Sequence, residues 1–159
     1  MVLIDFGIYF KDYASDFTRV LFTKTKKIYQ DIFDIVKAAN FFLRDTMLTG
    51  VKNREIQESL TKFLKSSLKK REVKVAIEDV FPHSWGHSLG LDVHDPCIFK
   101  DANSEIKTNT IVTIEPGLYF RKGIGGARFG IRFEDVLRVL PSKSEVLTRA
   151  FENFEDLIL

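Results

Sequence analysis

The spacing of hydrophobic residues changes along the chain, and each change predicts a different kind of element. Residues 2–10 and 17–22 form two apolar runs separated by a short polar stretch, a pattern that predicts two paired strands. From residue 28 to residue 42, apolar side chains recur every three or four positions, which predicts a helix that ends near Gly50. The first part of the chain is therefore expected to be a strand pair followed by a helix.

A second helix and a further set of strands are predicted for the rest of the chain. Asn53 is the predicted N-cap of this helix, and the apolar stripe between Ile56 and Leu64 continues until a basic run ends it. Beyond that run, short apolar segments are punctuated by glycine, and residues 111–120 and 127–140 are predicted to be strands.

Composition limits the kind of protein that these elements can build. A chain of 159 residues is long enough for one hydrophobic core but too short for two. Because no Pro- or Ser-rich linker divides it, residues 1–159 are predicted to form a single α+β domain. The 24 Lys and Arg nearly balance the 22 Asp and Glu, so no long-range field favours nucleic acid or a membrane surface as a partner.

The cysteine content and the hydropathy of the chain predict its compartment. The single cysteine, Cys97, excludes an internal disulfide and any cysteine-cluster metal site, which suits a reducing environment. No apolar run approaches the roughly 18 residues that a membrane span needs. We therefore expect a cytoplasmic protein that does not enter a membrane.

All three histidines of the chain lie within twelve positions, at His83, His87 and His94. Near pH 7 a neutral imidazole can bind a divalent metal, donate a hydrogen bond or transfer a proton. The concentration of all three in one segment therefore favours a chemical site. An ordinary polar loop that is rich in histidine is the alternative interpretation.

Acidic residues interrupt runs of the sequence that should be buried. Asp5 lies inside the first apolar run, and Glu115 and Glu134 each follow an apolar segment of a predicted strand. Burying an unpaired carboxylate costs on the order of several kcal/mol, so such residues are usually paired with cations or bound to metal. Ion pairs with nearby arginines would explain any one of these acids. Together with Asp16 and the histidines, they favour a metal site.

The types of these residues also indicate which metals they would bind. A set made mainly of carboxylates with one or two imidazoles suits manganese, cobalt or iron. The chain has enough ligands for two ions, and two bridged ions activate a water molecule for attack at neutral pH. The sequence therefore predicts hydrolysis as the reaction type.

The candidate residues lie in five short segments: Leu3-Ile-Asp-Phe-Gly7, Tyr13-Ala-Ser-Asp-Phe-Thr-Arg19, the histidine segment from His83 to Asp95, Thr113-Ile-Glu-Pro-Gly-Leu-Tyr119 and Gly130-Ile-Arg-Phe-Glu-Asp135. Together these segments resemble the catalytic domain of the Xaa-Pro aminopeptidase and Xaa-Pro dipeptidase (prolidase) family, dinuclear metallopeptidases of the pita-bread (creatinase/aminopeptidase) fold. The resemblance covers nearly the whole chain.

The resemblance implies a complete set of metal ligands. One ion would be held by Asp16, His87, Glu115 and Glu134, and the other by Asp5, Asp16 and Glu134. Two divalent ions are implied as cofactors, with manganese favoured and cobalt, iron or zinc as alternatives.

The resemblance also implies roles for residues beside the metals. Glu115 would serve as general base as well as ligand, and His83 and His94 would contact the scissile carbonyl or the developing oxyanion. Arg132 would lie beside the metal site, and its spacing of two from Glu134 on a strand predicts that both side chains point to one face. Trp85, where the family has a small residue, is expected to narrow the pocket.

The implied fold is a curved antiparallel sheet with helices packed on its outer face. The implied reaction is hydrolysis of the bond between an N-terminal residue and a following proline, so the implied partner is a peptide with proline at its second position. Xaa-Pro dipeptidase and methionine aminopeptidase activities are the alternatives within the same fold. Tyr13 and Tyr119 are expected to pack or to support the site rather than to catalyse.

Members of the family carry an N-terminal domain, then two further helices and a strand before the segment that begins here. We therefore expect this chain to be an N-terminally incomplete catalytic domain. The alternative from another functional class is an inactive truncated homologue, or a half-domain that acts only by association. A homodimer or a partner chain would then complete the fold.

Overall fold

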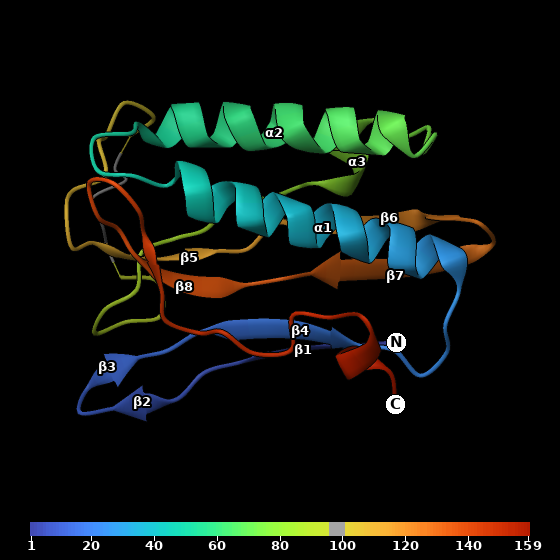
Figure 1. Cartoon of the computed structure of the whole chain (residues 1–159), viewed down its shortest axis with the longest axis horizontal. Helices are drawn as coiled ribbons and strands as arrows, with labels where there is room; N and C mark the ends of the chain where they lie inside the picture. Colours follow the sequence, from blue (N-terminus) through green and yellow to red (C-terminus); the bar gives the residue numbers. More distant parts are fainter. Residues whose placement is uncertain (96–100) are drawn as a thin grey trace.

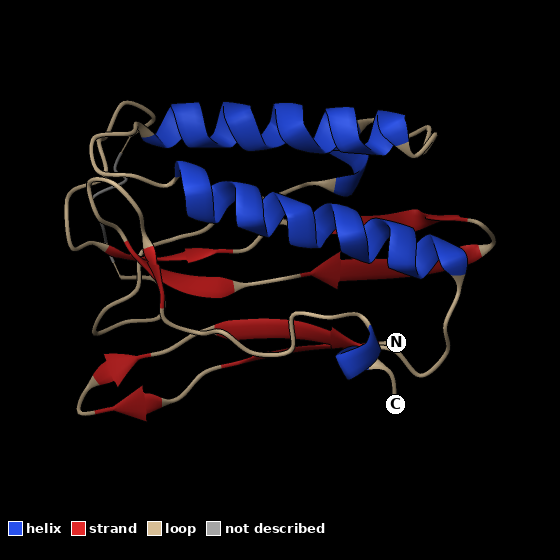
Figure 2. Cartoon of the chain, viewed as in Figure 1, coloured by secondary structure: helices blue, strands red, loops and turns tan. Residues whose placement is uncertain are grey.

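The computed structural model describes residues 1–95 and 101–159, in which two long helices lie over antiparallel strands (Figures 1 and 2). Cys97 lies outside the described residues. The first strands are β1 (Val2–Phe6) and β4 (Phe17–Leu21), which pair antiparallel along their whole length. Between them the short strands β2 (Tyr9–Phe10) and β3 (Tyr13–Ala14) form a hairpin. The predicted strand pair is confirmed, with an interruption that separates β1 from β2.

The helices α1 (Lys27–Thr46) and α2 (Asn53–Lys70) confirm the two predicted apolar stripes. Figure 2 shows α1 between α2 and the strands, so α1 contacts α2 on one side and the strands on the other. A short helix, α3 (Ile77–Val80), follows α2. None of the helices among the described residues is both long enough and apolar enough to span a membrane.

The prediction that Asn53 caps α2 is wrong. Lys52 occupies the N-cap position, and its main-chain N–H donates to the Glu55 carboxylate at 3.1 Å. Asn53 is the first residue of the helix, and its side-chain oxygen accepts a hydrogen bond from the indole N–H of Trp85 at 2.8 Å. A residue type that suits a helix cap is used here to satisfy a buried indole instead.

The last strands form an antiparallel ribbon that is broken in its middle. Strand β5 (Ile111–Ile114) pairs with β8 (Asp135–Arg138), and β6 (Gly117–Ile124) pairs with β7 (Ala127–Arg132). The short strand β9 (Glu145–Val146) extends the β8 side. Both predicted strands are therefore confirmed, but each is divided in two. The first is interrupted between β5 and β6 and the second between β7 and β8, and the two interruptions face each other.

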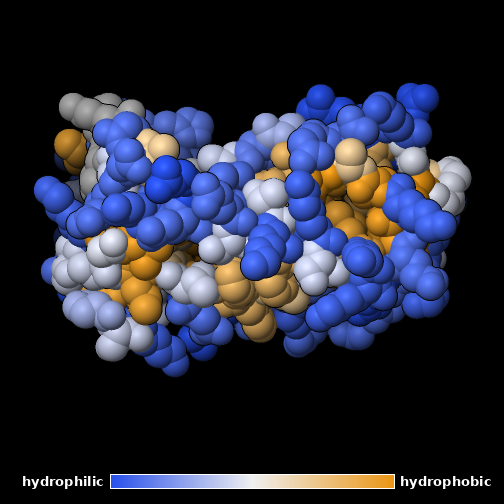
Figure 3. All heavy atoms as spheres, turned by 90° about the horizontal axis from the view of Figure 1, so that it is seen from above, coloured by the Kyte–Doolittle hydropathy of each residue, from blue (hydrophilic) through white to orange (hydrophobic). Residues whose placement is uncertain are grey.

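A continuous core lies between the helices and the strands, and the outer surfaces differ in character. Seen from the side of the helices (Figure 3), the surface is mainly hydrophilic, with hydrophobic atoms showing in hollows between polar groups. One groove lies between the end of α2 and α3 and is lined in part by Leu68, Val73 and Val75. On β1, β2 and β3, by contrast, large apolar side chains are exposed: Val2, Ile4, Phe6, Tyr9, Phe10 and Tyr13.

Candidate metal centre

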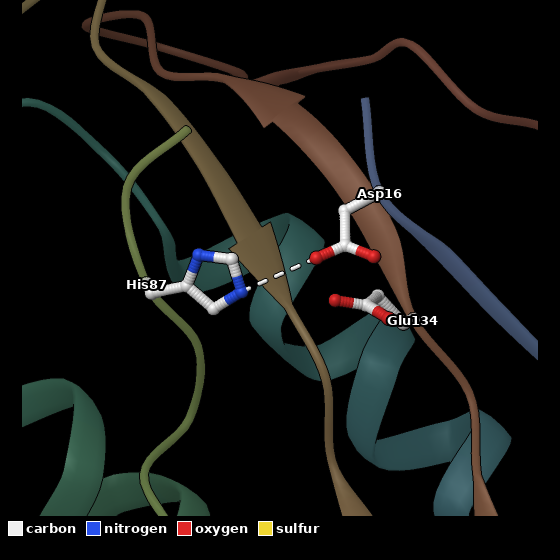
Figure 4. Close-up of side chains that lie close together, drawn as sticks. All are labelled: Asp16, His87 and Glu134. Carbon is white, nitrogen blue, oxygen red and sulfur yellow. Dashed lines mark ion pairs between the residues drawn. The ribbon is translucent and has the colours of Figure 1, made fainter. Parts of the chain in front are cut away.

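Three potential ligands from distant parts of the chain meet beside the broken ribbon. Asp16, His87 and Glu134 each offer one ligand atom, and these atoms lie within 4.8 Å of one another. Figure 4 shows the two carboxylates and the imidazole turned towards one another, with His87 Nε2 at 3.4 Å from Asp16 Oδ2. Asp16 directly precedes β4, and Glu134 lies between β7 and β8. The fold thus assembles a compact group of two acids and one histidine.

The position of His87 follows from main-chain hydrogen bonds between its segment and β5. The N–H of His87 donates to the Thr113 hydroxyl at 3.0 Å, and its carbonyl accepts from the Thr113 N–H at 2.8 Å. A Cβ at Gly86 would lie 2.1 Å from the Thr113 carbonyl oxygen, so glycine permits this close approach. His87 Nδ1 lies 3.0 Å from the Ser88 carbonyl oxygen and donates to it, which leaves Nε2 free to bind a metal.

Glu134 is the most deeply buried acid of the group. Burial, together with the nearby charges of Asp16 and Glu115, raises its pKa to about 7, although a hydrogen bond from Thr18 and the charge of Arg132 oppose the shift. That bond joins Thr18 Oγ1 to Glu134 Oε2 at 2.5 Å. A carboxylate in this environment is costly to ionise unless a cation lies beside it.

Asp16 and His87 form a mutually stabilising pair. Burial would raise the pKa of Asp16, but the hydrogen bond and the positive charge of His87 outweigh it and lower the pKa. Burial would lower the pKa of His87, but the bonds to Asp16 and Ser88 and the charge of Glu115 raise it. Each residue of the pair therefore favours the charged form of the other.

Glu115 lies at the edge of the group rather than inside it. Its Oε1 is 3.9 Å from His87 Nε2, and its Oε2 is 3.7 Å from Arg132 Nη1. Burial raises the pKa of Glu115, although the charges of Arg132 and His87 favour the ionised form. A raised pKa makes an ionised carboxyl group a better proton acceptor, which suits a general base beside a metal site.

Asp5, the fifth predicted ligand, is the least enclosed. It lies opposite Thr18 in the β1–β4 pair, and its side chain is 46% exposed. The Arg132 guanidinium forms an ion pair with its carboxylate. Asp5 is therefore held beside the group by an arginine, on the side of the site that faces solvent.

Thr18 connects several of the predicted residues, and it was not predicted from the sequence. Its hydroxyl accepts a hydrogen bond from Arg132 Nε at 3.1 Å and donates one to Glu134. Arg132 and Glu134 thus turn towards the same group, as their spacing predicted. The signal for Thr18 was present, because it lies two positions after Asp16, and alternate residues of a strand share a face.

The other two histidines also reach the site. The His83 ring lies 3.2 Å from the Tyr119 hydroxyl through Nε2, and its Nδ1 is 4.0 Å from Glu115 Oε2. Burial lowers the pKa of His83, which favours the neutral ring. The His94 ring packs edge-on against His87, with ring centroids 4.2 Å apart. Tyr119 supports His83 as expected, and the exposed Tyr13 lies on the β2–β3 hairpin.

The expectation that Trp85 narrows the pocket is wrong. Its side chain is buried in the core at 1% exposure, and its indole N–H donates to Asn53 at the start of α2. The large side chain thus fills space beneath the helices. The main chain of Trp85 contributes to the site, since its carbonyl accepts the N–H of Glu115 at 2.9 Å.

The donor set of the site matches a divalent cation. Carboxylate oxygens and one imidazole nitrogen are ligands of manganese, cobalt, iron and zinc. Burial and the charges of neighbouring acids raise the pKa of Glu134 and Glu115. Their negative charges are therefore not fully balanced by nearby positive charge, and the group has a deficit of positive charge. A bound divalent ion would remove that deficit, and on this ground the residues present fit the metal site that the sequence predicts.

The chain is similar to known proteins over most of its length. Residues 1–141 match the model of metallopeptidase family M24. An uncharacterized peptidase of Methanocaldococcus jannaschii is 30% identical over 159 residues, which cover 94% of this chain and 40% of that protein. An uncharacterized peptidase of Staphylococcus epidermidis is 30% identical over 150 residues, covering 93% and 39%. The chain spans about 40% of the length of the curated relatives that it matches.

Solved structures show the same likeness in three dimensions. A variant of Escherichia coli aminopeptidase P superposes with a TM-score of 0.81 at 28% identity, over 92% of this chain and 37% of that one. Icp55 from Saccharomyces cerevisiae, bound to the inhibitor apstatin, superposes with a TM-score of 0.86 at 27% identity, over 98% and 41%. The predicted pita-bread fold is confirmed.

Proposed function

Because the chain belongs to metallopeptidase family M24, we propose that it binds two divalent metal ions and hydrolyses the peptide bond between an N-terminal residue and a following proline. The observation that carries this proposal is the meeting of Asp16, His87 and Glu134 within 4.8 Å. The aminopeptidase among the structural neighbours supports the reaction class. Proline specificity suits a dedicated pocket, because the fixed φ and the tertiary amide of proline give the substrate a distinctive shape.

The candidate ligands divide between two ions. One ion would be held by Asp16, His87, Glu115 and Glu134, and the other by Asp5, Asp16 and Glu134. When bound, the ions would supply a water nucleophile at neutral pH and polarise the scissile carbonyl. The preponderance of carboxylates favours manganese, with cobalt, iron and zinc as alternatives.

The remaining site residues handle protons and charge on the substrate. Glu115 would take the proton of the attacking water and pass it to the leaving imino nitrogen, a role that its raised pKa supports. His83 and His94 would donate hydrogen bonds to the oxyanion that develops from the scissile carbonyl. Arg132, held by Asp5 and Thr18, would orient Glu115 from the side opposite His87.

Hydrolysis of the tripeptide Ala-Pro-Ala by the purified chain with manganese tests the proposal. We expect cleavage before proline, and we expect its loss both in a chelator and in the Glu115→Gln variant. Ala-Ala-Ala is the matched peptide for proline specificity, Ala-Pro for dipeptidase activity, and Met-Ala-Ser for methionine aminopeptidase activity. A folded chain that binds manganese but leaves Ala-Pro-Ala intact would contradict the aminopeptidase assignment.

A second candidate function is suggested by the exposed apolar side chains of β1 and β2, including Phe6 at 54% and Phe10 at 67%. Exposed hydrophobic clusters are common at protein interfaces. In this alternative, residues 1–159 are one part of a catalytic domain that works only in association with a partner chain or a second copy. Light scattering after size-exclusion chromatography separates the two candidates, because a monomer that cleaves the tripeptide is incompatible with the second.

We place either form in the cytoplasm, which the single cysteine supports.

A further inference from the structure

The two glutamates of the candidate metal centre lie where the ribbon is broken. Glu115 lies between β5 and β6, and Glu134 lies between β7 and β8. Across the break the N–H of Phe133 donates to the Pro116 carbonyl at 3.2 Å. Facing residues of an antiparallel ladder that exchange hydrogen bonds normally form two. Because proline has no N–H, the reciprocal bond from Pro116 to the Phe133 carbonyl cannot form.

A side chain of α1 provides the missing donor. Asn40 is fully buried, and its Nδ2 donates to the Phe133 carbonyl at 3.1 Å and to the Ile114 carbonyl at 3.4 Å. These carbonyls belong to the residues that directly precede Glu134 and Glu115. One amide group thus connects the main chain before one glutamate to the main chain before the other.

The orientation of the Asn40 amide is fixed by chemistry. A reversed amide would place Oδ1 against two carbonyl oxygens, which repel it, so Nδ2 must face the break. The cost is that Oδ1 is buried and finds no donor among the described residues. An unsatisfied buried acceptor costs about 1–3 kcal/mol. An apolar side chain would avoid that cost but would leave the Phe133 carbonyl without the donor that Asn40 supplies. Buried polar groups left unsatisfied in this way are characteristic of functional sites.

We propose that Asn40 is a positioning residue of the metal centre, which sets the separation of Glu115 and Glu134 by bonding to both strands at the break. This inference rests on the proposed metal-binding function. Ligand groups must be held within about 0.5 Å of their working geometry, and a break in a ladder lacks the regular hydrogen bonds that would hold them. On the opposite side, the main chain of Glu134 is fixed from β4, because its N–H donates to the Thr18 carbonyl at 3.2 Å. Asn40 supplies the matching restraint from the helical layer.

Cobalt binding tests this role, because the visible absorption of the ion reports both its affinity and its coordination geometry. Asn40→Leu keeps the number and branching of the side-chain heavy atoms and removes the donor. Val36→Ala is the matched control, since Val36 is also fully buried on α1, one turn earlier, and its side chain has no polar group. We expect Asn40→Leu to weaken cobalt binding by about 10- to 100-fold and to alter the absorption bands. Val36→Ala should leave both unchanged, even where urea unfolding shows an equal or larger loss of stability.

A double variant separates positioning from packing. Pro116→Ala restores a main-chain N–H opposite the Phe133 carbonyl, so adding it to Asn40→Leu should recover part of the lost affinity and move the bands back towards those of the unaltered chain. If Asn40→Leu does not fold, Asn40→Ser replaces it, and the same loss of affinity is expected. Unchanged cobalt affinity and spectrum in the Asn40 variant would overturn the positioning role while leaving the metal site intact. Failure of the unaltered chain to bind cobalt would overturn both proposals.

Discussion

Two neighbouring residues, Glu134 and Asp135, are both buried carboxylates, yet their surroundings are opposite. Glu134 is 2% exposed and receives one hydroxyl hydrogen bond from Thr18, with other acids close by. Asp135 is fully buried and faces two guanidinium groups, with Arg19 Nη2 at 2.9 Å and Arg44 Nη2 at 2.7 Å. Successive residues of an extended chain point to opposite sides, so one backbone segment presents one acid to each environment.

The comparison teaches that burial of an acid does not by itself indicate a site. Asp135 is neutralised by the protein, and its arginines also join separate elements, because Arg19 is on β4 and Arg44 is on α1. Arg19 is further enclosed between the rings of Phe17 and Phe133, at 4.1 and 3.7 Å from their centroids. Glu134 forms no ion pair with an arginine among the described residues, although the charge of Arg132 acts on it. The paired acid holds the fold together, whereas the unpaired acid is suited to a cation from solution.

The largest effect is expected when the paired acid is removed. Asp135→Ala leaves two buried guanidinium groups without their carboxylate, and breaking a buried pair in this way costs about 3–5 kcal/mol. The free energy of unfolding in urea measures the loss. Glu145→Ala is the matched control, since its pair with Arg138 is about half exposed and is expected to contribute under about 1 kcal/mol. Equal losses in the two variants would contradict the structural role of Asp135.

The unpaired acid, Glu134, should lower the stability of the chain when it is ionised and no metal is present. The folded chain keeps a proton on Glu134 up to a pKa of about 7, whereas the unfolded chain releases it near 4.5. The free energy of unfolding therefore falls as pH rises through this window, by an amount on the order of 3 kcal/mol. Glu134→Gln carries no charge, so we expect it to be more stable than the unaltered chain at pH 8 and similar at pH 5. Equal stability of the two chains at both pH values would show that Glu134 ionises without penalty.

Metal binding should offset the loss of stability that ionisation of Glu134 causes. Manganese at 100 times its dissociation constant is expected to stabilise the unaltered chain by about 2.7 kcal/mol, measured as a rise in the thermal midpoint. Glu134→Ala removes one of the two proposed ligands shared by both ions, so its midpoint should not respond and it should retain neither ion. Glu155→Gln changes an exposed residue near the C-terminal end of the sequence and serves as the control that keeps the full response. Retention of two ions by Glu134→Ala would refute the ligand assignment.

The smallest effect is expected at the exposed edge of the site. Asp5 is 46% exposed, and ion pairs of that kind contribute under about 1 kcal/mol, so Asp5→Asn should change the free energy of unfolding little. The metal content should nevertheless fall from two ions to one, because Asp5 is proposed to hold one ion only. Elemental analysis after dialysis measures the ratio. A ratio of two in the variant would remove Asp5 from the ligand set.

The sequence predicted the elements and the kinds of ligand because those depend on local patterns. The apolar spacing of α1 and α2 and the acids inside apolar runs can be recognised without knowing which segments meet. The break in the ribbon was missed because the runs around Glu115 and Glu134 read as continuous strands. Pro116 was the available signal, since it removes one donor from the ladder.

The contacts that support the site could not be predicted, because they join distant segments. Asn40 lies within the apolar stripe of α1, and its acceptors are 74 and 93 residues away in sequence. Trp85 was expected at the site from its place in the histidine segment, yet its partner is Asn53 on α2. In both cases a polar group is matched by the tertiary structure, which spacing along the chain does not reveal.

The residues of the candidate metal centre come from distant parts of the sequence, and this separation limits when a metal could bind during synthesis. Thr18 and Glu134, which share a hydrogen bond, are 116 residues apart. At ribosomal rates of about 5–20 residues per second, the second half of the centre emerges roughly 6–23 seconds after the first. During that interval Asp16 is already on the nascent chain, but the strands that carry Glu115 and Glu134 do not exist. Loading of the proposed metal centre would therefore be a late event that reports the completion of the β5–β8 ribbon.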